Sequence, residues 1–233
     1  MGSVQNDNKL IIISGHLGSG KTEFSLNYTT SLRSKNPDSK VILCDLDFIN
    51  PYFRSRLHKS ILEKAGVNLI TPENNEVAIA DIPSVSGKIK TAVTDKNSNV
   101  ILEVGGDDVG AIVLGHLNRD IMARGYEHYM VLNLFRPDTN DKDKIIQMIK
   151  MIERASRLKI THLIVNNHLM HETNASVVID GYKDLNAMNF NEVPIKYVCI
   201  NENFEKEFKK EVKLKENEEC FILKRFLRYV HES

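Results

Sequence analysis

The feature that most constrains this chain is a glycine-rich segment that directly follows its first apolar run. Residues 15–22 read Gly-His-Leu-Gly-Ser-Gly-Lys-Thr and complete the pattern G-x-x-x-x-G-K-[ST]. The apolar run 9–14 precedes the segment, and residues 23–34 follow it with the apolar spacing of a helix. A chain of this length would match the pattern by chance with a probability of about one percent or less. The order of strand, loop and helix therefore predicts a phosphate-binding loop.

The residue types in this loop suit the phosphates of a nucleotide and its Mg²⁺ ion. Glycines let the backbone turn so that its N–H groups surround a phosphate, and the positive end of the next helix adds to the attraction. Lys21 can reach the β- and γ-phosphates, and the Thr22 hydroxyl can bind Mg²⁺. The predicted nucleotide-binding residues of this segment are Gly15, Gly18, Ser19, Gly20, Lys21, Thr22 and Glu23.

Short apolar runs alternate with amphipathic stretches along the chain. The runs are rich in Ile, Val and Leu with little polar alternation, as expected for strands covered on both faces. The predicted strands span residues 9–14, 40–45, 67–71, 99–104, 126–134, 161–166 and 194–200. The predicted helices span residues 23–34, 107–124 and 141–158, and candidate caps for the third are Asp138, Thr139 and Asn140. This pattern predicts an α/β fold, doubly wound, with a mostly parallel sheet and helices on both faces.

We expect a single domain over residues 9–233 after a disordered tail at residues 1–8. The chain of 233 residues is long enough for one sizeable core, and neither a linker nor an internal repeat interrupts the pattern. The strongly charged stretch 202–219 predicts a solvated helix. The amphipathic stretch 221–230 predicts a closing helix that packs on the sheet.

Composition excludes several classes of protein. The chain has 31 basic and 31 acidic side chains, so it lacks the basic footprint of proteins that bind nucleic acid or anionic lipid. No apolar run approaches the roughly 20 residues that an integral membrane segment needs. Cys44, Cys199 and Cys220 are too far apart for a C-x-x-C metal site and odd in number, which is typical of a protein from the reducing cytoplasm.

Two aspartates follow the second predicted strand. Asp45 and Asp47 are two residues apart, so their carboxylates point the same way, toward the crevice where an open α/β sheet binds its ligand. Here the sequence resembles the MinD/ParA-like branch (SIMIBI class) of the P-loop ATPases, whose second strand ends in Asp-x-Asp. The resemblance implies that Asp45 holds Mg²⁺ through water and that Asp47 orients the attacking water. Capping of the next turn is the alternative for either residue.

The fourth predicted strand is similar to the same family with one change. Family members usually carry Asp where this chain has Glu103, followed after two residues by a glycine whose amide senses the γ-phosphate. Glu103 is a hard oxygen ligand that can still serve the metal, and Gly106 stands at the position of that glycine. Asp107 and Asp108 come next, either as caps of the following helix or as groups that act on water or on a partner.

The end of the sixth predicted strand bears on the choice of base. A GTPase of the common type would show Asn-Lys-x-Asp here, with the carboxylate bound to guanine, but residues 166–169 read Asn-Asn-His-Leu. The resemblance implies that Asn166 hydrogen-bonds adenine, with Asn167 as the near alternative. A plain turn residue is the other interpretation of an asparagine at this place.

One position departs from the family pattern. Members with a deviant loop carry a second lysine near the start of the loop, which reaches the partner's nucleotide across a dimer, whereas this chain has His16. A histidine is mostly neutral at pH 7 and cannot replace the permanent charge of lysine. We therefore expect His16 to be a loop residue. Arg54 and Arg56 are candidates for a trans-acting cation, although exposed arginines are more often only solvated.

The resemblance covers residues 9–201 and implies a Mg²⁺-dependent ATP-binding protein that hydrolyses ATP slowly and switches between nucleotide states. Lys21 and Asp47 are the implied catalytic residues, and Thr22, Asp45 and Glu103 are the implied metal ligands. The implied partners are the nucleotide, a second copy of the chain in a nucleotide-dependent homodimer, and an unknown protein client.

Three alternatives remain open from the residues. Glu103-Val104-Gly105-Gly106 also resembles the Glu-x-x-Gly of dethiobiotin and cobyrinate synthetases, which use ATP to act on a small molecule. A small-molecule kinase would need an arginine-bearing lid, for which no region between the predicted strands looks long enough. A non-catalytic ATP-binding adaptor fits poorly with an intact Lys21 and Thr22.

Overall fold

The centre of the molecule is a parallel sheet of eight strands. The computed structural model describes residues 8–46, 59–71, 87–106 and 108–226. The strands are β1 (Leu10–Ser14), β2 (Lys40–Leu46), β3 (Asn68–Ile70), β4 (Ser98–Val104), β5 (Glu127–Leu132), β6 (His162–Val165), β7 (Ile195–Asn201) and β8 (Glu219–Leu223). They lie in the order β3-β2-β4-β1-β5-β6-β7-β8, and every neighbouring pair is parallel. The predicted α/β fold is confirmed, and each predicted strand is present within two residues of its expected ends.

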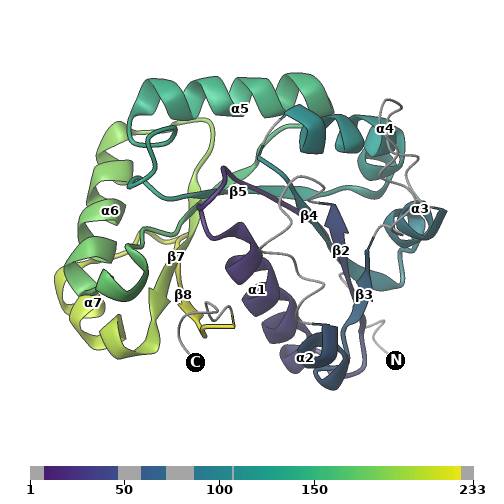
Figure 1. The fold of residues 1–233 in the computed structure, drawn as a ribbon, viewed down its shortest axis with the longest axis horizontal. Helices are drawn as coiled ribbons and strands as arrows, with labels where there is room; N and C mark the ends of the chain where they lie inside the picture. Colours follow the sequence, from purple (N-terminus) through teal and green to yellow (C-terminus); the bar gives the residue numbers. More distant parts are fainter. Residues whose placement is uncertain (1–7, 47–58, 72–86, 107, 227–233) are drawn as a thin grey trace.

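Helices cover both faces of the sheet (Figure 1). Those on one face are α1 (Lys21–Lys35) and α2 (Lys59–Lys64). Those on the other face are α3 (Gly87–Thr94), α4 (Asp108–Arg124), α5 (Lys142–Ser156), α6 (Ala175–Met188) and α7 (Glu205–Glu211). This arrangement explains why the strands are apolar on both sides, and it confirms the predicted helices on both faces.

The central strand shows how the sequence produces this layering. Ile11 and Ile13 of β1 pack in the cluster under α1, whereas Leu10 and Ile12 pack in the cluster under α4. All four side chains are at most 2% exposed. Burial of such a side chain is worth about 1.5–3 kcal/mol, so a strand with apolar residues at every position is stable only between two layers of helices.

The cap of α5 is Asp141 rather than one of the predicted residues Asp138, Thr139 and Asn140. The Asp141 carboxylate accepts a hydrogen bond from the backbone N–H of Lys144 at 2.9 Å. The Thr139 hydroxyl instead donates to the carbonyl of Asn133 and closes the preceding turn. The prediction was wrong because a cap must directly precede the first helical residue, and α5 begins at Lys142.

The C-terminal part of the chain differs from the prediction in two ways. Helix α6, which begins after its cap Asn174, was not predicted, and the predicted closing helix over 221–230 is wrong in its first part. Residues Glu219–Leu223 form β8, because Cys220 and Ile222 face one layer of helices while Phe221 and Leu223 face the other. Over so few residues, the sequence pattern of a strand with two apolar faces cannot be distinguished from that of an amphipathic helix. Residues 227–233 lie outside the described residues.

The chain order makes β1 the switch point of the sheet. From β1 the chain builds β2, β3 and β4 on one side, and then crosses over to build β5 to β8 on the other side. In open α/β sheets the ligand-binding crevice lies at the carboxyl ends of the strands that flank such a point. The sheet order therefore places residues 15–20 at this crevice, with the ends of β4 and β5 beside them.

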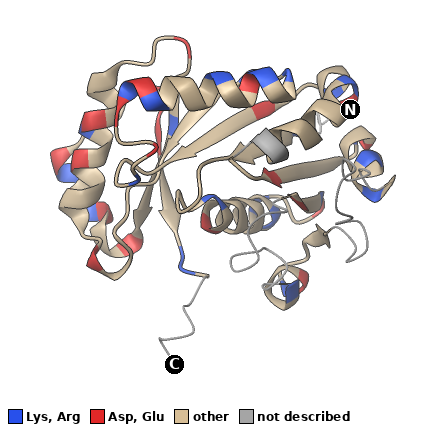
Figure 2. Cartoon of the chain, turned by 45° about the horizontal axis from the view of Figure 1, so that its top comes forward, with Lys and Arg blue, Asp and Glu red and all other residues tan. Residues whose placement is uncertain are grey.

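The outer faces of the helices carry charges of both signs. Figure 2 shows Lys and Arg interspersed with Asp and Glu along α5 and on the other helices in view. The equal numbers of acidic and basic side chains in the sequence agree with this mixture. Within the described ranges, no helix is both long enough and apolar enough to cross a membrane.

At the amino ends of the central strands, Glu127 is the centre of an ionic cluster. Its carboxylate accepts hydrogen bonds from Lys196 Nζ at 2.5 Å, from the Tyr129 hydroxyl at 2.9 Å and from Lys9 Nζ at 3.2 Å. Burial opposes ionisation of Glu127, but these hydrogen bonds and the two lysine charges outweigh it and lower the pKa of Glu127 to about 2. The cluster therefore ties the start of β5 to β7 and to the residue before β1.

Replacing Glu127 by Gln is expected to lower the melting temperature at pH 7, because charge-assisted hydrogen bonds are lost. Since the pKa of Glu127 is lower in the folded chain than the ordinary value of 4.5, its stabilisation is complete above pH 4.5 and disappears as the pH falls toward 2. The melting temperatures of the two proteins, followed by circular dichroism, should converge over this range. Glu172→Gln removes an exposed carboxylate and serves as the control. A difference that stays constant with pH would contradict this role.

Candidate functional site

The phosphate loop has the backbone geometry that its glycines predict. The backbone N–H of Ser19 donates to the carbonyl of His16 at 3.0 Å, which closes a turn inside the loop. Gly18 and Gly20 have φ angles of 76° and 84°, in the left-handed region that side chains other than glycine rarely adopt. Gly20 is also the residue before α1, and its carbonyl accepts the N–H of Phe24 at 2.9 Å. The loop therefore leads directly into the amino end of a helix, as an anion site requires.

The loop is in tight contact with the ends of the flanking strands. A Cβ atom on Gly106, which follows β4, would lie 2.2 Å from the carbonyl oxygen of Gly15. A Cβ atom on Gly15 would lie 2.6 Å from the carbonyl oxygen of Val131 in β5. Only glycine fits at these two places, because the obstructing atoms belong to the backbone and cannot rotate away. Gly106 is thus brought against the phosphate loop, at the position where the sequence predicts a γ-phosphate sensor.

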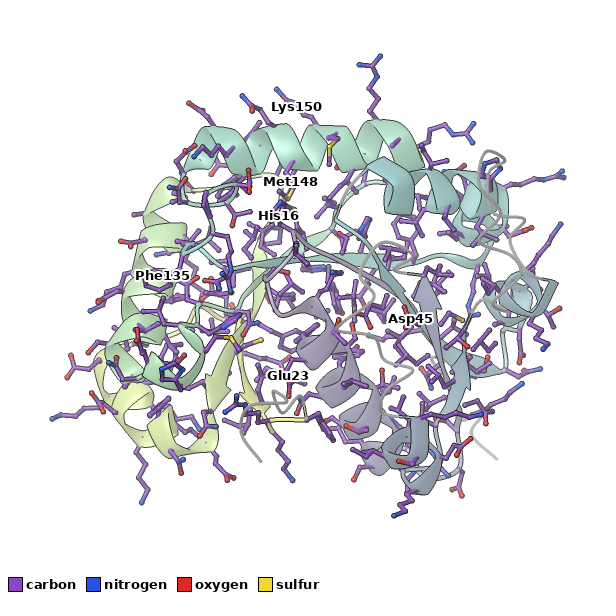
Figure 3. The ribbon with its side chains drawn as sticks, in the orientation of Figure 1. His16, Glu23, Asp45, Phe135, Met148 and Lys150 are labelled. Carbon is purple, nitrogen blue, oxygen red and sulfur yellow. The ribbon has the colours of Figure 1, made fainter. Side chains whose placement is uncertain are left out.

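Three predicted metal ligands are brought together next to the loop. The Thr22 hydroxyl donates a short hydrogen bond to Glu103 Oε1. Asp45 and Glu103 are register partners on the neighbouring strands β2 and β4, so their side chains share one face of the sheet, and each residue is 1% exposed. Figure 3 shows Asp45 at the end of β2. A hydroxyl and two carboxylates are the hard oxygen donors that suit Mg²⁺, so this donor set fits the ion that the sequence predicts.

Several predicted residues cannot be placed. Asp47, Arg54, Arg56 and Asp107 lie outside the described residues. Asp108 is the first residue of α4, and its side chain is likewise outside the description. The roles of these residues in orienting water, in contacting a partner or in capping a helix therefore stay predictions.

The two asparagines after β6 have different contacts. The Asn166 side-chain amide donates to the carbonyl of Ser19 in the phosphate loop at 2.8 Å. The Asn167 side-chain oxygen accepts the backbone N–H of Leu134 at 2.9 Å, so Asn167 joins the ends of β5 and β6. Both residues are buried, and both line the cavity described next. The adenine contact of Asn166 stays a prediction, but its contact with the loop is a second role that the sequence did not indicate.

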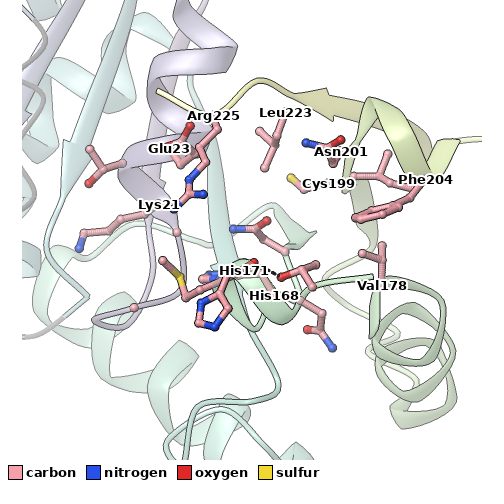
Figure 4. Close-up of a pocket in the computed structure, with 18 of the residues that line it drawn as sticks. Lys21, Glu23, His168, His171, Val178, Cys199, Asn201, Phe204, Leu223 and Arg225 are labelled. Atoms are coloured by element: carbon pink, nitrogen blue, oxygen red, sulfur yellow. Dashed lines mark hydrogen bonds between the residues drawn. The ribbon is translucent and has the colours of Figure 1, made fainter. Parts of the chain in front are cut away.

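A cavity of about 760 Å³ extends from the phosphate loop across the ends of β6, β7 and β8. Lys21, Glu23 and Arg225 line one part of it, and Val178 and Phe204 line another (Figure 4). The cavity thus combines a charged region beside the loop with an apolar region away from it. This combination suits a ligand with a polyphosphate and a flat organic group, such as a nucleotide.

The segment after β8 is attached to α1 beside this cavity. The Asn27 side chain donates to the carbonyl of Lys224 at 2.8 Å and accepts the N–H of Lys224 at 2.7 Å. Glu23 accepts the N–H of Phe226. Because Glu23 directly follows the phosphate loop, these bonds hold Arg225 at the edge of the cavity.

Sequence reasoning missed the contribution of the turn after β5. Arg136 Nε donates to the carbonyl of Gly18 at 2.9 Å, and Asp138 Oδ2 lies 3.3 Å from His16 Nε2. His16 is therefore a loop residue, as predicted, and it faces a carboxylate of its own chain. The strand order could have indicated this turn, because the ends of both strands beside β1 must meet the loop.

A second missed residue is His168, which follows the asparagines after β6. Burial and, to a smaller extent, the nearby charge of Arg136 together lower the pKa of His168 to about 4. His168 is therefore neutral at pH 7. It lines the cavity together with Arg136.

Comparisons with known proteins support the fold. No protein-family model and no curated protein matches the sequence. One similar solved structure is the cell division protein FtsY from Thermotoga maritima, with a TM-score of 0.56 and 15% identity over 85% of this chain and 63% of that chain. Another is the signal recognition particle receptor FtsY from Elizabethkingia anophelis in complex with GDP, with a TM-score of 0.53 and 19% identity over 88% and 61%. FtsY from Mycoplasma mycoides has a TM-score of 0.52 and 16% identity over 82% and 59%.

These likenesses establish the fold of the chain. This chain spans about three fifths of the length of the FtsY structures that it matches. At such low identities, the agreement in strands and helices is evidence for a common architecture and not for a common ligand. The chain shares the α/β fold of the FtsY structures, whereas its place in the SIMIBI class and in the MinD/ParA-like branch stays a prediction.

Replacing Gly106 by Ala is expected to weaken nucleotide binding at least tenfold, because the new methyl group would push against the backbone of Gly15. Gly87→Ala is the matched control, since a Cβ atom there has no neighbour within 4 Å among the described residues. Nucleotide affinity measured by calorimetry, with circular dichroism to verify folding, separates the two variants. Equal affinity in Gly106→Ala and the wild-type protein would contradict the tight packing of the loop against β4.

Proposed function

We propose that this chain binds ATP with Mg²⁺ and acts as a nucleotide-dependent switch of the MinD/ParA-like kind. The observation that carries the proposal is the buried donor set of Thr22, Asp45 and Glu103 beside a complete phosphate loop. A P-loop alone would bind phosphate, but carboxylates from β2 and β4 next to the loop's threonine are what a bound Mg²⁺ requires.

Each residue of this site has a distinct part in the proposal. The loop amides and Lys21 position the phosphates, and Lys21 is 5% exposed beside the cavity. Thr22, Asp45 and Glu103 would hold Mg²⁺, which when bound neutralises the charge that develops on the transferred phosphoryl group. Asp47 orients the attacking water, as the sequence resemblance implies. Hydrolysis then depends on positioning and electrostatics rather than on a covalent intermediate.

The choice of ATP over GTP rests on the polar side chains that line the cavity. Guanine offers two N–H donors that a carboxylate accepts well, and the only acidic residue among the described residues that line the cavity is Glu23, which directly follows the phosphate loop and accepts the N–H of Phe226. The amides of Asn166 and Asn201 also line the cavity. An amide oxygen can accept from the amino group of adenine. FtsY from Elizabethkingia anophelis was solved in complex with GDP. That ligand is a property of FtsY, so the affinities for ATP and GTP have to be compared directly on this chain.

Isothermal titration with ATP and with GTP, each with Mg²⁺ or with EDTA, tests the binding part of the proposal. We expect ATP to bind more tightly than GTP, and Mg²⁺ to strengthen the binding of ATP. Lys21→Ala should abolish it, because the positive charge at the phosphates is lost, whereas Lys35→Ala at the exposed end of the same helix should not. Tighter binding of GTP would overturn the choice of base, and no binding of either nucleotide would overturn the function.

Light scattering with and without Mg-ATP tests the switch. We expect the wild-type protein and Asp47→Ala, which slows turnover, to become dimeric with Mg-ATP, while Lys21→Ala stays monomeric. Phosphate release by the isolated protein should be slow and absent in Lys21→Ala. A molar mass that nucleotide does not change would contradict the switch and would favour an ATP-dependent synthetase that acts on a small molecule.

A further inference from the structure

The turn after β5 places a second cation against the phosphate loop. Arg136 Nε donates to the carbonyl of Gly18 at 2.9 Å. A Cβ atom on Gly18 would lie 2.8–3.2 Å from three atoms of the Arg136 guanidinium group. The guanidinium therefore packs directly on the loop, and this contact is possible only because position 18 has no side chain.

The contact fixes one peptide group of the loop at both ends. The N–H and C=O of a trans peptide point in opposite directions. In the peptide between Gly18 and Ser19, Arg136 holds the carbonyl while the N–H of Ser19 donates to His16. In the next peptide, Asn166 holds the carbonyl, because its side-chain amide donates to the carbonyl of Ser19. Two side chains from outside the loop thus set the direction of consecutive peptide groups around the phosphate position.

Arg136 has donors left over for a ligand. An arginine carries five N–H groups in a planar fork, of which Nε provides one and the two terminal amines provide four. Within the described part of the chain, the Arg136 side chain forms no hydrogen bond other than the one to Gly18. The residue is half-buried and lines the cavity together with Lys21 and Thr22.

The other groups near Arg136 do not replace its charge. His168 lines the cavity beside it and is neutral at pH 7, because burial and the charge of Arg136 both lower the pKa of His168. His16, which stands at the place of the family's second lysine, faces Asp138 instead. Arg136 is therefore positioned to add a permanent charge to that of Lys21, from the same chain.

We propose that Arg136 is a nucleotide-binding residue that acts in cis: Nε orders the loop through Gly18, and the terminal amines contact a phosphate oxygen of the nucleotide in the same chain. This inference rests on the proposed function of the site. It supplies a charge within one chain where relatives with a deviant loop receive one from a partner. Lysine would be a poor substitute, because a single ammonium group cannot hold the carbonyl and a phosphate in this fork geometry.

The test is the affinity for ATP of the full-length wild-type protein, Arg136→Gln, Arg136→Lys and Arg157→Gln, measured by calorimetry at several salt concentrations. Arg157→Gln is the matched control, because Arg157 also donates to a backbone carbonyl, that of Gly115, but away from the cavity. It removes the same net charge. Circular dichroism verifies that each variant is folded.

We expect Arg136→Gln to weaken ATP binding about tenfold, which corresponds to roughly 1.4 kcal/mol. The logarithm of the dissociation constant should also depend less steeply on salt, because one fewer cation contacts the phosphates. Arg136→Lys should keep the salt dependence and recover only part of the affinity, and Arg157→Gln should match the wild-type protein.

The outcomes distinguish this inference from the proposed function. If the wild-type protein binds ATP and Arg136→Gln binds it equally well, the inference is overturned while the proposed function stands. If Arg136→Gln lowers the affinity but leaves the salt dependence unchanged, the phosphate contact is overturned. Such a result would mean that Arg136 acts only by ordering the loop through Gly18. If the wild-type protein itself fails to bind ATP or GTP, the proposed function fails and the inference fails with it.

Discussion

The arrangement of the site depends on two buried carboxylates that lie side by side. Asp45 and Glu103 are register partners at the carboxyl ends of β2 and β4, and both are almost completely shielded from water. Ionised carboxylates in such a place repel each other unless an opposite charge or a hydrogen-bond donor compensates them. The Thr22 hydroxyl supplies such a donor to Glu103. The Mg²⁺ ion of the proposed function would supply the opposite charge. The placement of β4 between β1 and β2 is what brings these three oxygen-bearing groups together.

The phosphate loop is ordered from outside as well as by its own sequence. Gly106 after β4, Arg136 after β5 and Asn166 after β6 each contact the backbone of the loop. Every one of these contacts comes from the carboxyl end of a strand, because a parallel sheet brings all such ends to one edge. A loop held in this way has its N–H groups oriented before the ligand arrives. The free-energy cost of ordering the loop on ligand binding is therefore smaller.

The sequence predicted most of the fold but only part of the site. Apolar runs with no polar alternation identified the buried strands, because burial on both faces leaves a local signal in each strand. The mistakes occurred where local patterns are ambiguous. Residues 221–223 begin an amphipathic stretch that predicts a helix, but in β8 Ile222 faces one layer of helices while Phe221 and Leu223 face the other. Arg136 and His168 went unnoticed, since an arginine or histidine in a turn has no motif around it, and its meaning depends on which loop lies opposite.

The sequence by itself determined the phosphate loop, because its glycine spacing is required by the backbone conformation of eight consecutive residues. It also determined the parallel α/β class, through the alternation of buried strands and amphipathic helices. Only the tertiary structure decided which residues meet that loop. Glu103, Arg136 and Asn166 are separated from it by 80 residues or more, and their contacts with it follow from the order of strands in the sheet. That order is set by packing across the whole core, which no local segment of the chain encodes.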